Sequence, residues 1–194
     1  MKKIFIVTFL LFVNLVFSQA IKSENLVGKP FGNYTFETLN GDTLSINNVV
    51  KNKPRIMIVS ASWCAPCQAQ TLAVNELVDK YYSKVDFFTL LWDLKRDVVE
   101  MKDKYNDKIT LIPSKIQEEN IACISISGFK HCAGFPTIYA IDENNIIQAV
   151  KTGASMEITT THEGKTYKVS AEEAHENNLD SLEEIILNLL KAKD

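Results

Sequence analysis

The chain has 194 residues, of which 46% are hydrophobic and 23% are charged, and its formal net charge is −3. This length fits one globular domain with a hydrophobic core and small additions. The mild acidity argues against nucleic acid and against an anionic membrane surface as partners.

The chain begins with the layout of a secretory signal peptide. A basic start (MKK) precedes an apolar run over 4–17, and the small residues Ser18 and Ala20 follow it. We therefore predict a signal peptide over 1–20, cleaved after Ser18 or Ala20, and a periplasmic domain over 21–194. The apolar run is shorter than the roughly 20 residues of a spanning helix. An uncleaved anchor is the alternative.

The first predicted elements of the domain are strands. Residues 26–52 form an entry region in which the alternating segments 34–39 and 42–46 flank Asn40-Gly41, a dipeptide typical of hairpin turns. The next segment, 55–60 (RIMIVS), is apolar without polar alternation. It therefore predicts a central strand buried on both faces.

The pair Cys64 and Cys67 follows that strand directly, and apolar residues at helical spacing predict a helix over 68–82. A strand over 85–92 comes next. The segment 96–105 then predicts a helix with an inward face made of Val98, Val99, Met101 and Tyr105.

The second half continues the alternation. A strand over 109–112 is expected to stop at Pro113, and a helix is predicted over 117–126. Strands over 136–142 and 146–151 form a hairpin. An added hairpin falls in an insert over about 155–178, before a final amphipathic helix over 179–191. Together these elements predict an α/β domain with a mixed sheet flanked by helices.

The placement of Cys64 between a buried strand and a helix predicts redox chemistry. At the first turn of a helix, unpaired N–H groups and the helix dipole favour a thiolate over a thiol. Cys67 lies one turn further on, where it can attack Cys64 and resolve a mixed disulfide. Pro66 suits a helix start, because its missing N–H is not needed there.

Other roles for this pair fit less well. A zinc site needs two further ligands, and Cys123, Cys132 and His131 do not have a usual ligand spacing. A purely structural bridge would close a very small loop and stabilise little. A copper(I) carrier is the alternative of a different class, but no Met or His lies close to the pair in sequence. We expect no metal and no other cofactor.

The two remaining cysteines, Cys123 and Cys132, are predicted to form a second disulfide. All four cysteines lie beyond the predicted signal peptide, and export permits disulfides to persist. The spacing pairs Cys64 with Cys67 and Cys123 with Cys132. Two unpaired thiols that pack as small apolar side chains are the alternative.

Two motifs carry a resemblance to a known family. The stretches 62–67 (SWCAPC) and 134–137 (GFPT) resemble the two signatures of the thioredoxin fold. The entry region over 26–52 is similar to that of the exported TlpA/ResA-like branch. The likeness covers 26–152 and the last helix. It implies a thioredoxin-like domain, with an N-terminal hairpin extension and a small insert before the C-terminal helix.

The resemblance also implies site roles. Pro136 is expected to be cis and to face the cysteines. Substrate contacts are expected from Trp63, Ala65, Pro66, Phe135 and Pro136. One position departs from the family, because thioredoxins carry a buried acid where this chain has Ile58. Another group or water must then move the proton of the resolving thiol, and Glu118 and Glu119 are candidates only by their proximity to a loop.

We therefore expect an exported thiol–disulfide oxidoreductase that reduces disulfides of periplasmic proteins through Cys64 and Cys67. Its expected partners are protein thiols and disulfides and a membrane-bound electron donor, and it is expected to be a monomer. A periplasmic disulfide oxidase or isomerase and a copper metallochaperone are the alternatives. An adaptor that binds partners through the insert is a third.

Overall fold

The structure is a computed structural model that describes residues 26–46, 53–115, 124–126, 129–131 and 133–191. The predicted signal peptide and the second cysteine pair, with Glu118 and Glu119, lie outside the described residues. None of the helices in the described part of the chain is long and apolar enough to cross a membrane.

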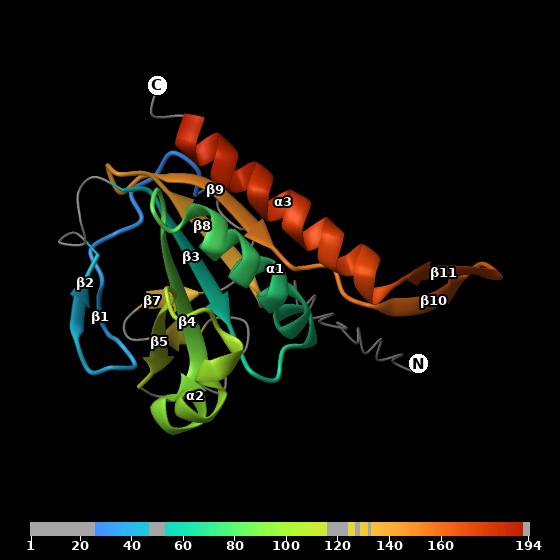
Figure 1. Cartoon of the computed structure of the whole chain (residues 1–194), viewed down its shortest axis with the longest axis horizontal. Coiled ribbons are helices and arrows are strands. Elements are labelled where there is room, and N and C mark those ends of the chain that lie inside the picture. The colour runs from blue at the N-terminus through green and yellow to red at the C-terminus, as the bar shows by residue number, and fades with distance from the viewer. Residues whose placement is uncertain (1–25, 47–52, 116–123, 127–128, 132, 192–194) are drawn as a thin grey trace, which may run out of the picture.

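A five-stranded sheet forms the centre of the molecule (Figure 1). Its middle strand is β3 (Arg55–Ser60), which runs parallel to β4 (Asp86–Leu94) and antiparallel to β8 (Thr137–Ile141). The strands β5 (Thr110–Ser114) and β9 (Ile147–Thr152) complete it at the two edges. The predicted mixed sheet is therefore confirmed.

Both faces of β3 are covered, which explains why its sequence shows no polar alternation. On one face Ile56 and Ile58 pack in a cluster with α1 (Ala65–Tyr81) and α3 (Ala171–Lys191). On the other face Met57 packs with Phe31, Phe36, Ile46 and Val59, which brings the N-terminal segment onto the sheet. Because strand side chains alternate between faces, a strand between two such layers must be apolar throughout.

The entry region forms the predicted hairpin. Strand β1 (Thr35–Glu37) pairs antiparallel with β2 (Thr43–Ser45). The loop is longer than the predicted two-residue turn, because Glu37 faces Thr43 across the pair. Gly41 has a φ of 93°, a conformation that side chains disfavour.

Three sequence predictions in the middle of the chain are wrong. Residues 124–126 are not helical: β6 (Ile124–Ile126) pairs with β7 (Phe129–His131), and the β-branched residues favour this outcome. Pro113 lies inside β5 rather than ending it, which an edge strand tolerates. Val99 is 50% exposed, because the helix α2 (Lys95–Met101) turns the neighbouring Val98 inward, and the 3₁₀-helix η1 (Lys102–Lys104) follows this helix.

The insert contains the predicted hairpin, formed by β10 (Ile158–His162) and β11 (Lys165–Val169). However, α3 begins at Ala171 and not at the predicted residue 179. Its first turns are mostly polar, so hydrophobic periodicity does not reveal them. The amide of Glu173 donates to Oγ of Ser170 over 3.1 Å, and this S-x-x-E pattern is the sequence signal for the true start.

Tyr139 in β8 gives the fold a testable alkaline limit. Burial, with a smaller effect of Tyr34, raises its pKa from 10.0 to about 12. Between those values the folded protein keeps a proton that the unfolded chain releases, so stability falls as the pH rises. We predict that Tyr139→Phe reduces the loss of unfolding free energy between about pH 9 and pH 11.5, measured by urea denaturation. A variant that keeps the full loss contradicts this.

Candidate redox site

Cys64 and Cys67 form a disulfide at the point where β3 passes into α1. The S–S distance is 2.04 Å and the Cα atoms are 5.2 Å apart, within the normal ranges. Cys64 is the N-cap of α1, with extended backbone angles, and its sulfur accepts a hydrogen bond from the amide of Cys67 over 3.2 Å. The Cys64 sulfur therefore lies against the free N–H groups of the first helical turn.

The charges around this helix start favour a thiolate. The first turn of α1 contains no acidic residue, and Pro66 occupies a position where no N–H is required. The backbone dipoles and N–H groups of a helix N-terminus stabilise negative charge. In the reduced protein, they would stabilise the Cys64 thiolate relative to the thiol.

Aromatic rings form a wall beside the two cysteines. The ring of Trp63 packs edge-to-face against Trp92 at 5.9 Å and against Phe135 at 5.5 Å, between centroids. Trp63 is 52% exposed, whereas Cys64 is only 5% exposed. The Phe135–Pro136 peptide bond is cis, as the resemblance implied.

The structure thus brings together the site residues predicted from the two motifs. Phe135 packs against the small cluster that contains Cys64 and Cys67. Ala65 is exposed on the first turn of α1, Pro66 beside it is half-buried, and Pro136 is buried.

Asp93 is the residue near the site that the sequence reasoning missed. It lies near the end of β4, is 4% exposed, and accepts a hydrogen bond from the Ser62 amide over 2.8 Å and a second from the Ser62 hydroxyl. The side chain of Gln68 donates to the Ser62 carbonyl from the other side. These bonds hold the peptide that directly precedes Trp63. Ile58, where an acid is absent, is buried in the core.

Tyr105 adds a second polar group behind the site. Its pKa is raised to about 12, first by burial and second by the charge of Asp93, although a hydrogen bond with Ser60 opposes the shift. Tyr105 therefore stays protonated at any physiological pH. A sequence signal for Asp93 exists, since it is an acid that follows the apolar run 87–92, and the predicted strand ended one residue too early to include it.

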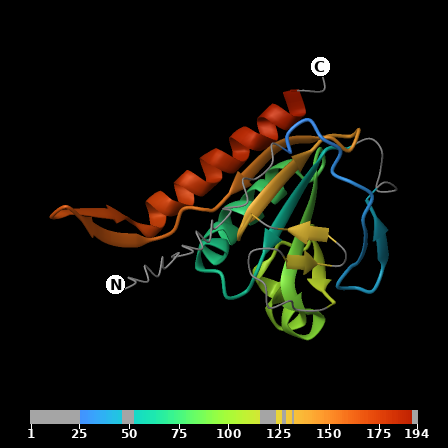
Figure 2. The ribbon, with the colours of Figure 1, turned by 180° about the vertical axis from the view of Figure 1, so that it is seen from behind.

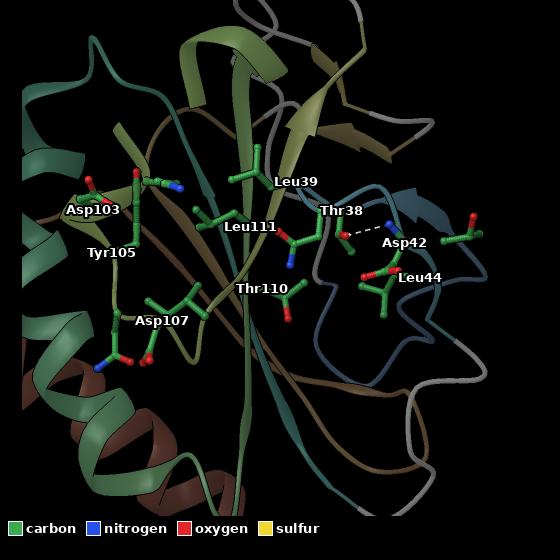
Figure 3. Close-up of a pocket in the computed structure, with 14 residues that line it drawn as sticks. Thr38, Leu39, Asp42, Leu44, Asp103, Tyr105, Asp107, Thr110 and Leu111 are labelled. Atoms are coloured by element: carbon green, nitrogen blue, oxygen red, sulfur yellow. Dashed lines mark hydrogen bonds between the residues drawn. The ribbon is translucent and has the colours of Figure 1, made fainter. Parts of the chain in front are cut away.

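Two hollows meet at Tyr105. One of about 450 Å³ is lined by Cys67, Leu72, Asn75 and Met101 as well as Tyr105. The other, of about 580 Å³, lies between the β1–β2 loop and the segment 102–111 (Figure 3). Asp42, Asp103 and Asp107 are among the residues around this second hollow. Within the described ranges, no group of three or more His, Cys, Asp or Glu side chains is arranged to hold a metal.

Comparison with known proteins finds relatives whose names refer to thioredoxin or to thiol:disulfide interchange. The "Thioredoxin-like protein YneN" of Bacillus subtilis is 24% identical over 65% of this chain and 71% of its own. The "Thiol:disulfide interchange protein DsbE" of Pseudomonas fluorescens is 28% identical, over 39% of this chain and 42% of its own.

Solved structures share the fold. A protein of Chlorobium tepidum described as a thiol:disulfide interchange protein DsbE has a TM-score of 0.57 at 18% identity, over 84% of this chain and 97% of that one. The thioredoxin domain of a Bacteroides vulgatus thiol-disulfide oxidoreductase has a TM-score of 0.52 at 14% identity, over 81% and 96%.

These findings confirm the resemblance to thioredoxin-fold, TlpA/ResA-like proteins. The family model described as Redoxin matches residues 26–168, which is more than half of the chain. The chain therefore belongs to the Redoxin family.

Proposed function

We propose that the protein is an exported thiol–disulfide oxidoreductase that reduces disulfides of periplasmic proteins. The observation that carries this proposal is the Cys64–Cys67 disulfide at the N-terminus of α1, beside an exposed tryptophan. A bridge between residues three apart adds little stability, whereas the same position favours thiolate chemistry.

In the reducing direction, the Cys64 thiolate attacks one sulfur of a substrate disulfide. A bond forms between Cys64 and that sulfur as the substrate bond breaks, and the leaving sulfur takes a proton. Cys67 then gives up its proton and attacks Cys64. This step re-forms the disulfide described above and releases the substrate as a dithiol, so two electrons have passed to the substrate. A membrane-bound donor would then supply two further electrons, which with two protons reduce the Cys64–Cys67 disulfide to the dithiol.

The substrate would lie against Trp63, Ala65, Pro66, Phe135 and Pro136. The exposure of Trp63 and Ala65 and the packing of Phe135 against the cysteine cluster support this role. Asp93 would act as a positioning residue, since its two hydrogen bonds fix Ser62 and with it the start of this surface.

Export is supported by the basic and apolar composition of residues 1–20. Export would also permit the proposed Cys123–Cys132 disulfide to persist. The same dithiol could run in the opposite direction as an oxidase or isomerase, because direction depends on the reduction potential and not on the step itself. The relatives named for disulfide interchange support exchange in general.

The two cysteines are predicted to have unequal roles. Reduced Cys67→Ser protein mixed with 5,5′-dithiobis(2-nitrobenzoate) should form a lasting mixed disulfide, because nothing displaces the nitrothiobenzoate from Cys64. Wild-type protein should release that group within the same experiment. Cys64→Ser is the matched control, which measures the reaction of every other thiol and should form its mixed disulfide much more slowly, because Cys67 lacks the capping position that favours a thiolate. Equal rates in both variants would contradict the assignment of Cys64 as nucleophile.

Asp93 is predicted to stabilise the segment before Trp63. Asp93→Leu leaves the Ser62 amide without its acceptor and should lower the free energy of unfolding by about 2–3 kcal/mol. Asp93→Asn keeps an acceptor and should recover a large part of that loss. Asp79→Ala is the control, since it removes an exposed ion pair with Lys108 and should change the stability little. Urea denaturation measures all three, and equal losses for Asp93→Leu and Asp79→Ala would refute the role.

A further inference from the structure

The hairpin β10–β11, here called the arm (158–169), projects from the body of the molecule. Figures 1 and 2 show it extending past the first turn of α3, away from the central sheet. Within the described chain its two strands pair only with each other. Every strand residue of the arm is exposed except Val169, which is half-buried.

The chain that leads to the arm leaves the sheet at the end where β3 passes into the redox site. The end of β9 faces the start of β8, where Thr152 pairs with Thr137. The amide of Gly153 donates to the carbonyl of Pro136 over 2.8 Å, so the residue that follows β9 is bonded to the cis-proline loop. The connection that leads to the arm therefore starts beside the cis-proline loop.

A buried side chain holds the connection between β9 and the arm. Asn178 in α3 is 1% exposed, and its amide group bonds both the N–H and the carbonyl of Ser155, each over 2.8 Å. These two hydrogen bonds hold the connection between β9 and the arm against the helix. A buried amide that bonds through both its oxygen and its nitrogen orders the segment that it holds.

One face of the arm carries apolar side chains that no part of the described chain covers. The register places Ile158 opposite Val169 and Thr160 opposite Tyr167, so these four side chains share one face. Ile158 is 43% and Tyr167 is 53% exposed. A lone two-stranded hairpin is only marginally stable in water, and cross-strand pairs of this kind add little to its stability. Their position indicates a surface used for contact.

Apolar side chains are also exposed around the redox site itself. Trp63 is 52% exposed, and Leu72 on α1 is 65% exposed and lines the hollow beside Cys67. Together with Ile158 and Tyr167 they make half of the large apolar side chains exposed in the described residues, the others being Val27, Tyr82, Val99 and Leu187. Exposed apolar side chains are therefore present both at the redox site and on the arm.

We propose that the arm binds an extended segment of the polypeptide whose cysteine exchanges with Cys64, which rests on the proposed function. The segment would run from the mixed disulfide past Pro136 and place an apolar side chain against Ile158 and Tyr167. The unpaired edges of the arm offer backbone groups to such a strand.

Other occupants suit the arm less well. The apolar face holds too few side chains for a stable contact between two copies of this chain. The arm carries charges of both signs, Lys165 and Lys168 with Glu163, and lacks the basic face of a membrane-binding element.

The geometry sets the length of the bound segment. Ile158 lies five positions after Gly153, so the arm begins at most about 17 Å from that residue, and its strands span about 17 Å more. An extended peptide needs about ten residues to reach from Cys64 to the tip of the arm. Substrates with only one or two residues around the cysteine cannot touch it.

Peptide length therefore provides the test. Reduced protein is mixed with peptide disulfides of 2-nitro-5-thiobenzoate, whose release is followed by absorbance. The probes are a tripeptide and two peptides of about twelve residues with apolar side chains, with the cysteine near either end. At least one long peptide should react about tenfold faster than the tripeptide with wild-type protein. The double variant Ile158→Thr/Tyr167→Thr should bring this ratio close to one.

Tyr82→Thr is the matched control, because Tyr82 is 48% exposed at the opposite end of α1, and it should keep the wild-type ratio. The proposal is overturned if wild-type protein shows no excess for either long peptide, or if the double variant retains the excess. It is also overturned if light scattering shows a dimer that the double variant loses, or if vesicle binding depends on the arm. A tripeptide that fails to react with wild-type protein would instead contradict the proposed function.

Discussion

Cys64 ends the extended segment that follows β3 and caps α1, and its sulfur accepts the amide of Cys67. This contact decides the geometry of the whole site. A cap places the sulfur where helix N–H groups and the dipole favour negative charge. It also puts Cys67 one turn away, close enough to bond. The capping position itself depends on β3, whose two buried faces anchor the strand between both layers of the core.

The site is held by elements far apart in the sequence. Asp93 from β4 fixes Ser62, Phe135 from the proline loop packs on Trp63, and Gly153 after β9 bonds the carbonyl of Pro136. All of these segments lie at the end of the sheet where β3 ends. The strand β3 pairs parallel with β4 and antiparallel with β8, and β8 pairs antiparallel with β9. These pairings bring the segments that carry the site to the same end of the sheet. The connection that leads to the arm begins from the same end, which links its position to the redox chemistry.

The sequence predicted the parts of this design that depend on local pattern. The apolar run of β3, the CxxC pair at a helix start and the hairpins follow from periodicity and turn residues. Asp93 could not be placed in this way, because its partner Ser62 is brought close only by pairing of β3 with β4. The sequence predicts a helix over the strand at 124–126, since short apolar runs do not distinguish the two. The polar start of α3 has no apolar stripe, and only its cap at Ser170 marks it.

The reduction potential of the Cys64–Cys67 pair tests the central claim most directly. Protein equilibrated with dithiothreitol and glutathione buffers would be alkylated and its oxidised fraction measured, with Cys64→Ser as the control. A working reductant should have a potential between about −200 and −290 mV, close to thioredoxin. A value below about −300 mV would mark a structural bridge and contradict the account. A value of about −120 mV, which is typical of a strong oxidant, would contradict the reducing role.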